Sequence, residues 1–238
     1  GKCFCGGADQ QSMMDHLQII TTADGSASLL HTGLQETYHS RHGAVQESLH
    51  VFIRQGLDFL VSKKRRGVVS IFEVGLGTGL NALLTWQACL KNEFRVHYTA
   101  IEAHPLSADV YEQLKYSDDE QIHSLFRAIH SIPWNSEVTL DGNFNLLKIE
   151  GSLLEIELAA GKFDVIYFDA FAPSKQPEMW ALPVLEKVVR SMKAGAVFVT
   201  YSARGQLKRD LASLDLDVAT LEGPPGKKEM VRAVKREH

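Results

Sequence analysis

The residues most suggestive of chemistry form a glycine-rich turn, FEVGLGTGLN, at positions 72–81. Its glycines, Gly75, Gly77 and Gly79, occupy alternate positions after an apolar run. A dinucleotide-binding fingerprint, G-x-G-x-x-G, would need a glycine at position 80, where this chain has Leu80. The turn therefore predicts a nucleoside cofactor other than a dinucleotide. Glycine is needed in the turn because side chains would block the approach of the cofactor.

Acidic residues near this turn indicate the charge of the ligand. Glu73 precedes the first glycine by two positions, where it would repel a pyrophosphate. S-adenosylmethionine has a sulfonium and an ammonium group and no phosphate, so a carboxylate there favours it. Glu102 ends the next predicted strand, from which an acidic side chain can accept hydrogen bonds from both ribose hydroxyls. We predict S-adenosylmethionine as the cofactor, bound by Glu73, Glu102, Asn81 and the three glycines. An oxidoreductase using a nicotinamide cofactor is the competing interpretation, and Leu80 opposes it.

A second segment, DAFAPSKQPEMW at positions 169–180, follows a predicted strand. Doubly wound sheets bind ligands at the carboxyl ends of their strands, so Asp169 is expected beside both the cofactor and the reacting group. Phe171 and Trp180 would supply flat apolar walls. The structural alternatives are that Asp169 caps the following helix and that Trp180 covers the core.

Strand and helix patterns alternate from residue 68 onward. The alternation predicts an α/β, Rossmann-like, mostly parallel doubly wound sheet. A hairpin of 218–221 and 230–235 would add a C-terminal antiparallel edge strand. The predicted strands are 68–74, 95–102, 143–150, 163–169 and 196–201, and the predicted helices are 80–90, 105–114, 120–129, 184–192 and 205–214.

The rest of the chain completes one domain. With 238 residues, of which 45% are hydrophobic, the chain can bury one sizeable core. We expect residues 1–15 to be a flexible leader or an expression remnant, and residues 16–67 to be strands and a helix packed on a core of 68–238. The helix is indicated by apolar residues at helical spacing over 45–61.

Composition limits the class of protein. The net charge is −4, but from Lys175 onward there are twelve Lys and Arg against eight Asp and Glu, which permits a local phosphate-binding face. The three cysteines form no CxxC pair, and the ten histidines show no metal-ligand spacing. No apolar run reaches the ~20 residues of a membrane span. We expect a cytoplasmic protein with no metal and no membrane contact.

Residues 31–238 resemble the methyltransferase domain of the enzymes that complete 5-methylaminomethyl-2-thiouridine at the wobble position of tRNA. Beyond the two segments above, the similarity includes Glu102 and two further stretches. These are QETYHSRHGA at 35–44, followed by Glu47-Ser48, and KKEM at 227–230.

The resemblance implies methyl transfer from S-adenosylmethionine to the primary amine of 5-aminomethyl-2-thiouridine. It implies that Asp169 is the catalytic aspartate and that tRNA binds through its anticodon stem-loop. Ser152 stands where relatives often have an acid that contacts the adenine amino group, which leaves the adenine contact open. Because the chain has no room for the flavin-dependent oxidoreductase fused to this domain in some bacteria, we expect a stand-alone form served by a separate enzyme. The substrate-binding residues are expected to be Tyr38, Arg41, His42, Phe171, Pro173, Lys175, Trp180, Lys227 and Lys228.

Two further alternatives remain open at this point. Related folds share the cofactor site, so the acceptor could be another amine, methylated or aminopropylated. The chain could also be an RNA-binding relative that has lost turnover.

Overall fold

The computed structural model describes residues 16–63, 67–92 and 94–237. The leader expected at 1–15 lies outside the described residues, as do Cys3 and Cys5. Within the described part, no helix is both long and apolar enough to cross a membrane.

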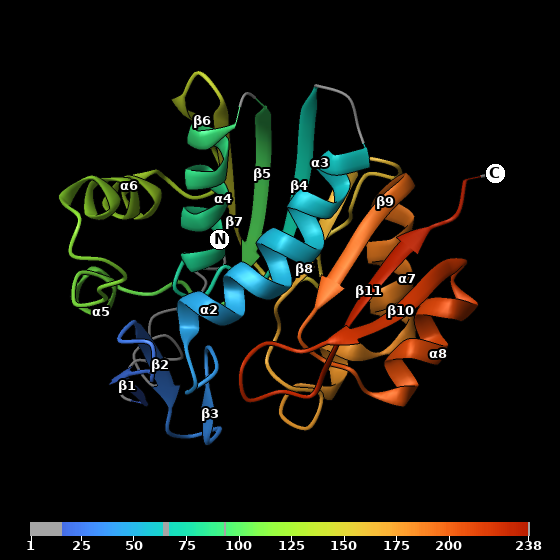
Figure 1. Ribbon diagram of the computed structural model, residues 1–238, viewed down its shortest axis with the longest axis horizontal. Helices are drawn as coiled ribbons and strands as arrows, with labels where there is room; N and C mark the ends of the chain where they lie inside the picture. Colours follow the sequence, from blue (N-terminus) through green and yellow to red (C-terminus); the bar gives the residue numbers. More distant parts are fainter. Residues whose placement is uncertain (1–15, 64–66, 93, 238) are drawn as a thin grey trace, which may run out of the picture.

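The centre of the molecule is an eight-stranded sheet in the order β10-β11-β9-β8-β4-β5-β7-β6 (Figure 1). The five inner strands from β9 to β7 are parallel, whereas the β10–β11 hairpin and β6 add antiparallel neighbours at the two edges. The predicted Rossmann-like sheet with a C-terminal antiparallel strand is thus confirmed; β6 had no counterpart in the prediction. The strands span Val68–Val74 (β4), Arg95–Glu102 (β5), Glu137–Asp141 (β6), Phe144–Glu150 (β7), Phe163–Phe168 (β8), Met192–Thr200 (β9), Leu216–Glu222 (β10) and Glu229–Lys235 (β11).

Helices cover both faces of this sheet (Figure 1). Leu80–Lys91 (α4) and Glu120–Ser131 (α6) lie on one face, and Leu182–Ser191 (α7) and Gly205–Ser213 (α8) lie on the other. Each face has its own cluster of buried apolar side chains. β8 is buried along its whole length, which explains why its sequence is a nearly continuous apolar run.

The amphipathic helix expected over 45–61 is present, but its geometry differs from a plain α-helix. Ala44–Ser48 (α2) and Phe59–Lys63 (α3) flank a π-helical segment, Leu49–Asp58 (η1). The run crosses the same face as α4, with Phe52 packed on Tyr167 at 5.2 Å between ring centroids (Figure 1). Apolar spacing cannot distinguish the two helix types over so few turns.

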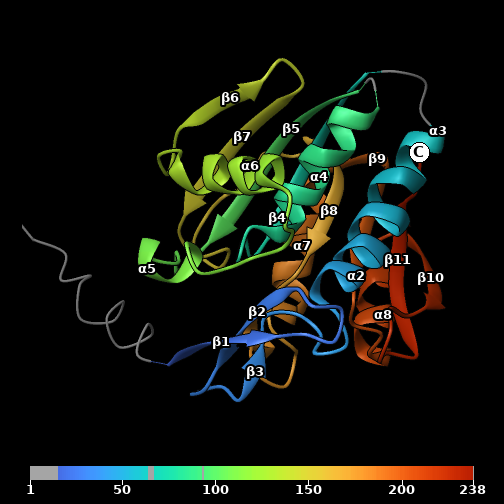
Figure 2. The same ribbon diagram turned by 60° about the vertical axis from the view of Figure 1, so that its left-hand side comes forward.

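A small antiparallel sheet lies beside the carboxyl ends of the central strands (Figures 1 and 2). It comprises Leu17–Thr21 (β1), Ala27–His31 (β2) and Glu36–Thr37 (β3). The turn between β1 and β2 reaches the start of α2, where an Asp24 carboxylate oxygen accepts from the Gln46 backbone N–H at 3.1 Å.

One predicted helix is shorter than expected, and one short helix was not predicted. The helix predicted over 105–114 is a single turn, Ala108–Tyr111 (α5), because the preceding stretch is extended and exposed or half-buried. Within the segment 169–180, Pro177–Trp180 forms a short 3-10 helix (η2).

Candidate active site

The glycine turn connects β4 to α4 and adopts a backbone that other residues tolerate poorly. The φ angles of Gly75, Gly77 and Gly79 are 85°, 52° and 78°. A Cβ on Gly75 would lie 2.9 Å from the Asp169 carbonyl oxygen, and one on Gly77 would lie 3.2 Å from the Tyr38 ring. Left-handed backbone and close contacts together explain why the turn needs glycine.

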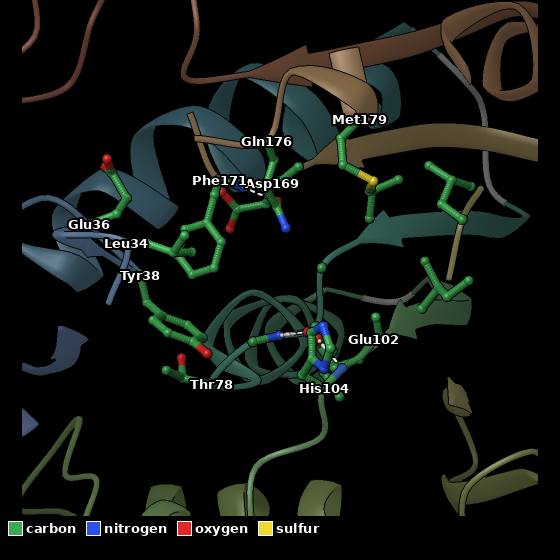
Figure 3. A pocket seen from close by; sticks show the side chains of 18 of the residues that line it. Leu34, Glu36, Tyr38, Thr78, Glu102, His104, Asp169, Phe171, Gln176 and Met179 are labelled. Carbon is green, nitrogen blue, oxygen red and sulfur yellow. Dashed lines mark hydrogen bonds between the residues drawn. The ribbon is translucent and has the colours of Figure 1, made fainter. Parts of the chain in front are cut away.

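A cavity of about 320 Å³ opens over this turn (Figure 3). Its walls come from the carboxyl ends of β4, β5 and β8, from the segment following β3, and from the turn of the C-terminal hairpin. The volume lies in the usual range of small-ligand sites. Eight of the predicted site residues line the cavity. They are Gly75, Gly77, Tyr38, Glu102, Ser152, Asp169, Phe171 and Lys227.

Glu102 lies at the cavity wall with its carboxylate held in place. One oxygen accepts from the Gly77 backbone N–H and the other from the His104 backbone N–H, both at 2.9 Å (Figure 3). Burial raises the pKa of Glu102 and these hydrogen bonds oppose the rise. Each carboxylate oxygen can accept a second hydrogen bond, so the side chain remains able to accept from a ligand.

Asp169 follows β8 and points into the cavity (Figure 3). Its Oδ2 accepts from Asn81 Nδ2 at 2.9 Å. Burial and the nearby Glu47 raise the pKa of Asp169 to about 7, against the Asn81 hydrogen bond and Lys227, which lower it. The carboxyl group is therefore close to its midpoint of ionisation at neutral pH.

Glu73 does not line the cavity, contrary to the prediction that its charge faces the cofactor. It is fully buried, and it accepts from Asn81 Nδ2 at 3.0 Å. Asn81 is likewise buried behind the cavity wall. The strand alternates its side chains between two faces, and at Glu73 that alternation directs the carboxyl group under the turn.

The two aromatic residues of the segment 169–180 have different surroundings. Phe171 lines the cavity and packs edge-on against Tyr38, with ring centroids 5.1 Å apart. Trp180 lies beneath the loop, buried against Phe168, and its Nε1 donates to the Phe171 carbonyl oxygen at 2.8 Å. Trp180 thus supports the loop and does not form a wall of the cavity, as expected in the structural alternative.

Several other predicted residues lie outside the cavity. Arg41 and His42 are exposed next to it, and Gly226 packs directly against the His42 ring. Pro173, Lys175 and Lys228 are also absent from the lining.

Lys227 reaches the cavity but already has partners. Its ammonium group contacts a Glu47 carboxylate oxygen at 2.7 Å and lies 3.9 Å from the centre of the Tyr201 ring. Glu47 also accepts from the Ser40 backbone N–H at 2.9 Å. These contacts join the hairpin turn to α2 at the edge of the cavity.

The sequence predictions omitted several residues that line the cavity. Gln176 and Met179 belong to the segment 169–180, and Glu47 follows the segment 35–44, so all three could have been selected from the similarity alone. Gln176 Oε1 accepts from the Phe171 backbone N–H at 3.2 Å (Figure 3). Glu36 lies within the segment 35–44 and could likewise have been selected, whereas nothing in the local sequence marks His104 or Tyr201, which tertiary packing brings to the site.

Ser152 lines the cavity near the ends of β5 and β7, and its hydroxyl accepts from the Leu154 backbone N–H at 3.2 Å. The hydroxyl hydrogen remains available to an acceptor on a ligand. Among residues 16–63, 67–92 and 94–237, no three His, Cys, Asp or Glu side chains are grouped so that they could hold a metal ion.

Comparison with known proteins agrees with this geometry. Residues 119–236 match a family model described as S-adenosyl-L-methionine-dependent methyltransferase. The chain is 31% identical over 209 residues to the tRNA 5-methylaminomethyl-2-thiouridine biosynthesis bifunctional protein MnmC of Ectopseudomonas mendocina, covering 82% of this chain and 32% of that protein. It is 32% identical over 212 residues to the protein of the same name from Cupriavidus necator, covering 83% and 31%. The chain thus spans about a third of the length of these relatives.

A solved structure, MNMC2 from Aquifex aeolicus, has the same fold. The TM-score is 0.77 at 28% sequence identity, and the match covers 91% of this chain and 70% of that one.

The cavity fits the cofactor that the family description implies. Because residue 77 is glycine, the space beside the Tyr38 ring stays open, whereas a Cβ at this position would occupy it. Glu102 offers a fixed carboxylate at the strand end, where an adenosine ribose is bound in such folds. Glu36, Glu47, Glu102, Asp169 and Glu178 all line the cavity, and this excess of acidic residues over Lys227 suits a ligand with positive charge. The chain belongs to the family of S-adenosyl-L-methionine-dependent methyltransferases.

Proposed function

We propose that the chain methylates the primary amine of 5-aminomethyl-2-thiouridine at the tRNA wobble position. The observation that carries the proposal is the position of Asp169, which lies in the cavity beside the glycine turn with a pKa near neutrality. The names of the relatives support the choice of substrate, since both describe biosynthesis of tRNA 5-methylaminomethyl-2-thiouridine, the product of this methylation. A tRNA substrate would place the activity in the cytoplasm.

In this proposal the protein works mainly by positioning. Bound S-adenosylmethionine supplies an electrophilic methyl group on its sulfonium. Asp169 accepts a hydrogen bond from the amine, orients its lone pair and takes up the proton released as the new bond forms. Asn81 keeps the carboxylate in place throughout.

The other assignments follow from the side chains at the cavity wall. Gly75 and Gly77, which line the cavity, give the cofactor access to the turn, and Glu102 accepts from its ribose. Gly79 is absent from the lining, and a Cβ there would meet the His130 ring. Ser152 stands on the adenine side. Phe171, whose ring is held by Tyr38 and by the hydrogen bonds of its backbone, provides the apolar surface against which the uridine base stacks.

Binding of the anticodon stem-loop is assigned to basic residues around the cavity, including the exposed Arg41 and Lys228 and the half-buried Lys175. Lys227 is a weaker candidate for a phosphate contact because Glu47 already neutralises it. A separate enzyme that exposes the primary amine would have to supply the substrate.

The proposal is tested by incubating the protein with labelled S-adenosylmethionine and tRNA that carries 5-aminomethyl-2-thiouridine, followed by nucleoside analysis. We expect label in 5-methylaminomethyl-2-thiouridine, and its rate of appearance should fall sharply with an Asp169→Asn variant. Label in a different nucleoside or in a polyamine would replace the proposed acceptor. Bound cofactor with no transfer to any acceptor would favour the RNA-binding alternative.

A further inference from the structure

Glu73 and Asn81 form a buried connection to the active-site carboxylate. Glu73 lies on β4 and Asn81 in the first turn of α4, and both are almost inaccessible to solvent. Neither lines the cavity, whereas Asp169 does. A ligand in the cavity therefore does not contact Glu73, and the hydrogen-bonded route from Glu73 to the cavity runs through Asn81 and Asp169.

One amide nitrogen joins the two carboxyl groups. Asn81 Nδ2 donates to Glu73 at 3.0 Å and to Asp169 Oδ2 at 2.9 Å. An amide nitrogen carries two hydrogens, so both are used and the group cannot rotate without losing both bonds. The Asp169 carboxylate is also fixed at its base, because its backbone N–H donates to the Val74 carbonyl oxygen at 3.0 Å. Oδ1 of Asp169 is left as the oxygen for a ligand.

Two carboxylates in this enclosed position would repel each other strongly, so one of them should hold a proton. Glu73 is the more enclosed, and no basic side chain bonds to it among the described residues. Its second oxygen is buried without a hydrogen-bond partner among those residues. Burial first, and Asp169 second, raise the pKa of Glu73 well above its usual value, although Asn81 and Tyr98 lower it.

The other titratable groups around the pair do not reverse this order. The Tyr98 hydroxyl on β5 lies beside Glu73 and lowers its pKa, whereas Glu102 raises it. Burial keeps Tyr98 and Tyr167 neutral by raising their pKa values. On the cavity side, Glu47 raises the pKa of Asp169 and Lys227 lowers it. The positive charge of Lys227 therefore favours ionisation of Asp169 and not of Glu73.

We propose that Glu73, in its neutral protonated form, is a positioning residue that holds Asp169 through Asn81 and does not bind the cofactor with its charge. The role of Asp169 in this statement rests on the proposed methyl transfer. The protonation of Glu73 and its separation from the cofactor do not, and they can be measured without tRNA.

The first experiment measures cofactor affinity by calorimetry. Glu73→Gln keeps an acceptor for Asn81 and adds no charge, so we expect a Kd for S-adenosylmethionine within about twofold of the wild type. Glu102→Gln, which alters a carboxylate that lines the cavity, is the matched control and should weaken binding by about tenfold or more. The proposal is wrong if Glu73→Gln weakens binding of S-adenosylmethionine tenfold but leaves that of S-adenosylhomocysteine, which lacks the sulfonium charge, unchanged.

The second experiment measures thermal stability against pH. A glutamate that is neutral when folded and ionised when unfolded costs increasing stability as pH rises above its unfolded pKa of about 4.3. Glu73→Gln removes this cost, so its Tm should exceed that of the wild type by a margin that grows between about pH 5.5 and about pH 8.5. Asp169 contributes equally to both proteins and cancels. A margin that stays constant or shrinks with pH would show that Glu73 is ionised in the folded protein.

The third experiment tests the link to catalysis. Glu73→Leu removes the acceptor that anchors Asn81, so kcat should fall by about tenfold while KM for S-adenosylmethionine changes little. The pH at which kcat is half-maximal should rise, since Asp169 loses the hydrogen bond that lowers its pKa. Glu73→Gln should recover most of the lost kcat and restore the pH profile. An unshifted profile in Glu73→Leu, or no recovery with Gln, would exclude the positioning role; absence of transfer by the wild type would instead refute the proposed function.

Discussion

Asp169 has an ionisation equilibrium that suits a proton acceptor. Its pKa of about 7 comes chiefly from burial, with Glu47 adding to the rise. A raised pKa in the folded state also means that Asp169 costs stability as pH increases from about 4 to 7, because the unfolded chain ionises first. This cost is typical of carboxyl groups that are held for chemistry in a partly closed site.

The rate should therefore depend on pH through Asp169. We expect kcat to rise with pH to a plateau above about 7, as Asp169 becomes ionised. Asp169→Asn should lower kcat by ~10²–10⁴-fold and abolish this dependence. Single-turnover rates from about pH 5.5 to 9 measure both effects. Glu178→Gln, at an exposed carboxylate on the cavity wall, is the control and should retain the same midpoint; an Asp169→Asn profile that keeps it would assign the titration to another group.

Gly77 allows a second test at the residue scale. Its φ of 52° and the nearby Tyr38 ring disfavour a side chain, so Gly77→Ala should lower the free energy of unfolding by ~1–2 kcal/mol. It should also weaken S-adenosylmethionine binding, because either the turn or Tyr38 must shift. Calorimetry and denaturant unfolding measure the two effects. Gly142→Ala, where the added Cβ meets nothing within 4 Å, is the control, and equal behaviour of the two variants would contradict the prediction.

At the scale of elements, the sequence predicted the parallel core well because β8 and its neighbours are buried on both faces and read as apolar runs. The glycine turn and Glu102 were located correctly for the same reason, since each ends such a strand. Glu73 was misassigned because a strand that is buried on both faces shows no apolar alternation, so its sequence does not indicate toward which face of the sheet each side chain points. Short edge strands such as β3 and β6, and the π-helical η1, depend on tertiary contacts that local sequence does not encode.

The π-helical segment has a packing requirement that can be tested. A Cβ on Gly56 would lie 2.9 Å from a Val199 methyl carbon and 3.3 Å from the Tyr167 ring, so η1 lies unusually close to the sheet. Gly56→Val should overpack this contact and lower the free energy of unfolding by ~2–3 kcal/mol. Urea unfolding of Gly56→Val, with Gly142→Val as the control in open space, measures the difference. Full stability of Gly56→Val would mean that η1 can move away from the sheet without cost.

At the scale of the whole molecule, the feature that bears on substrate binding is the placement of acidic and basic side chains around the cavity. The basic excess after Lys175 is partly neutralised, since Lys227 pairs with Glu47 and Lys208 with Glu229. Five acidic residues and Lys227 line the cavity, while other basic side chains such as Arg41 and Lys228 are exposed. An acidic cavity with basic residues on nearby loops suits a ligand whose amine enters the site while its phosphates remain outside.

Lys228 is the residue at which this arrangement can be tested. It is exposed next to Lys227 in the hairpin turn, so Lys228→Glu should weaken binding of tRNA several-fold at low salt and reduce the slope of log K against log salt by about one. Methyl transfer at saturating tRNA should change little, because backbone contacts supply affinity and not chemistry. Lys91→Glu reverses the same charge at the exposed end of α4, at the far end of that helix from the glycine turn, and should leave both affinity and slope as in the wild type. Equal slopes for Lys228→Glu and Lys91→Glu would remove Lys228 from the tRNA-binding surface and leave the acidic cavity and its amine ligand unaffected.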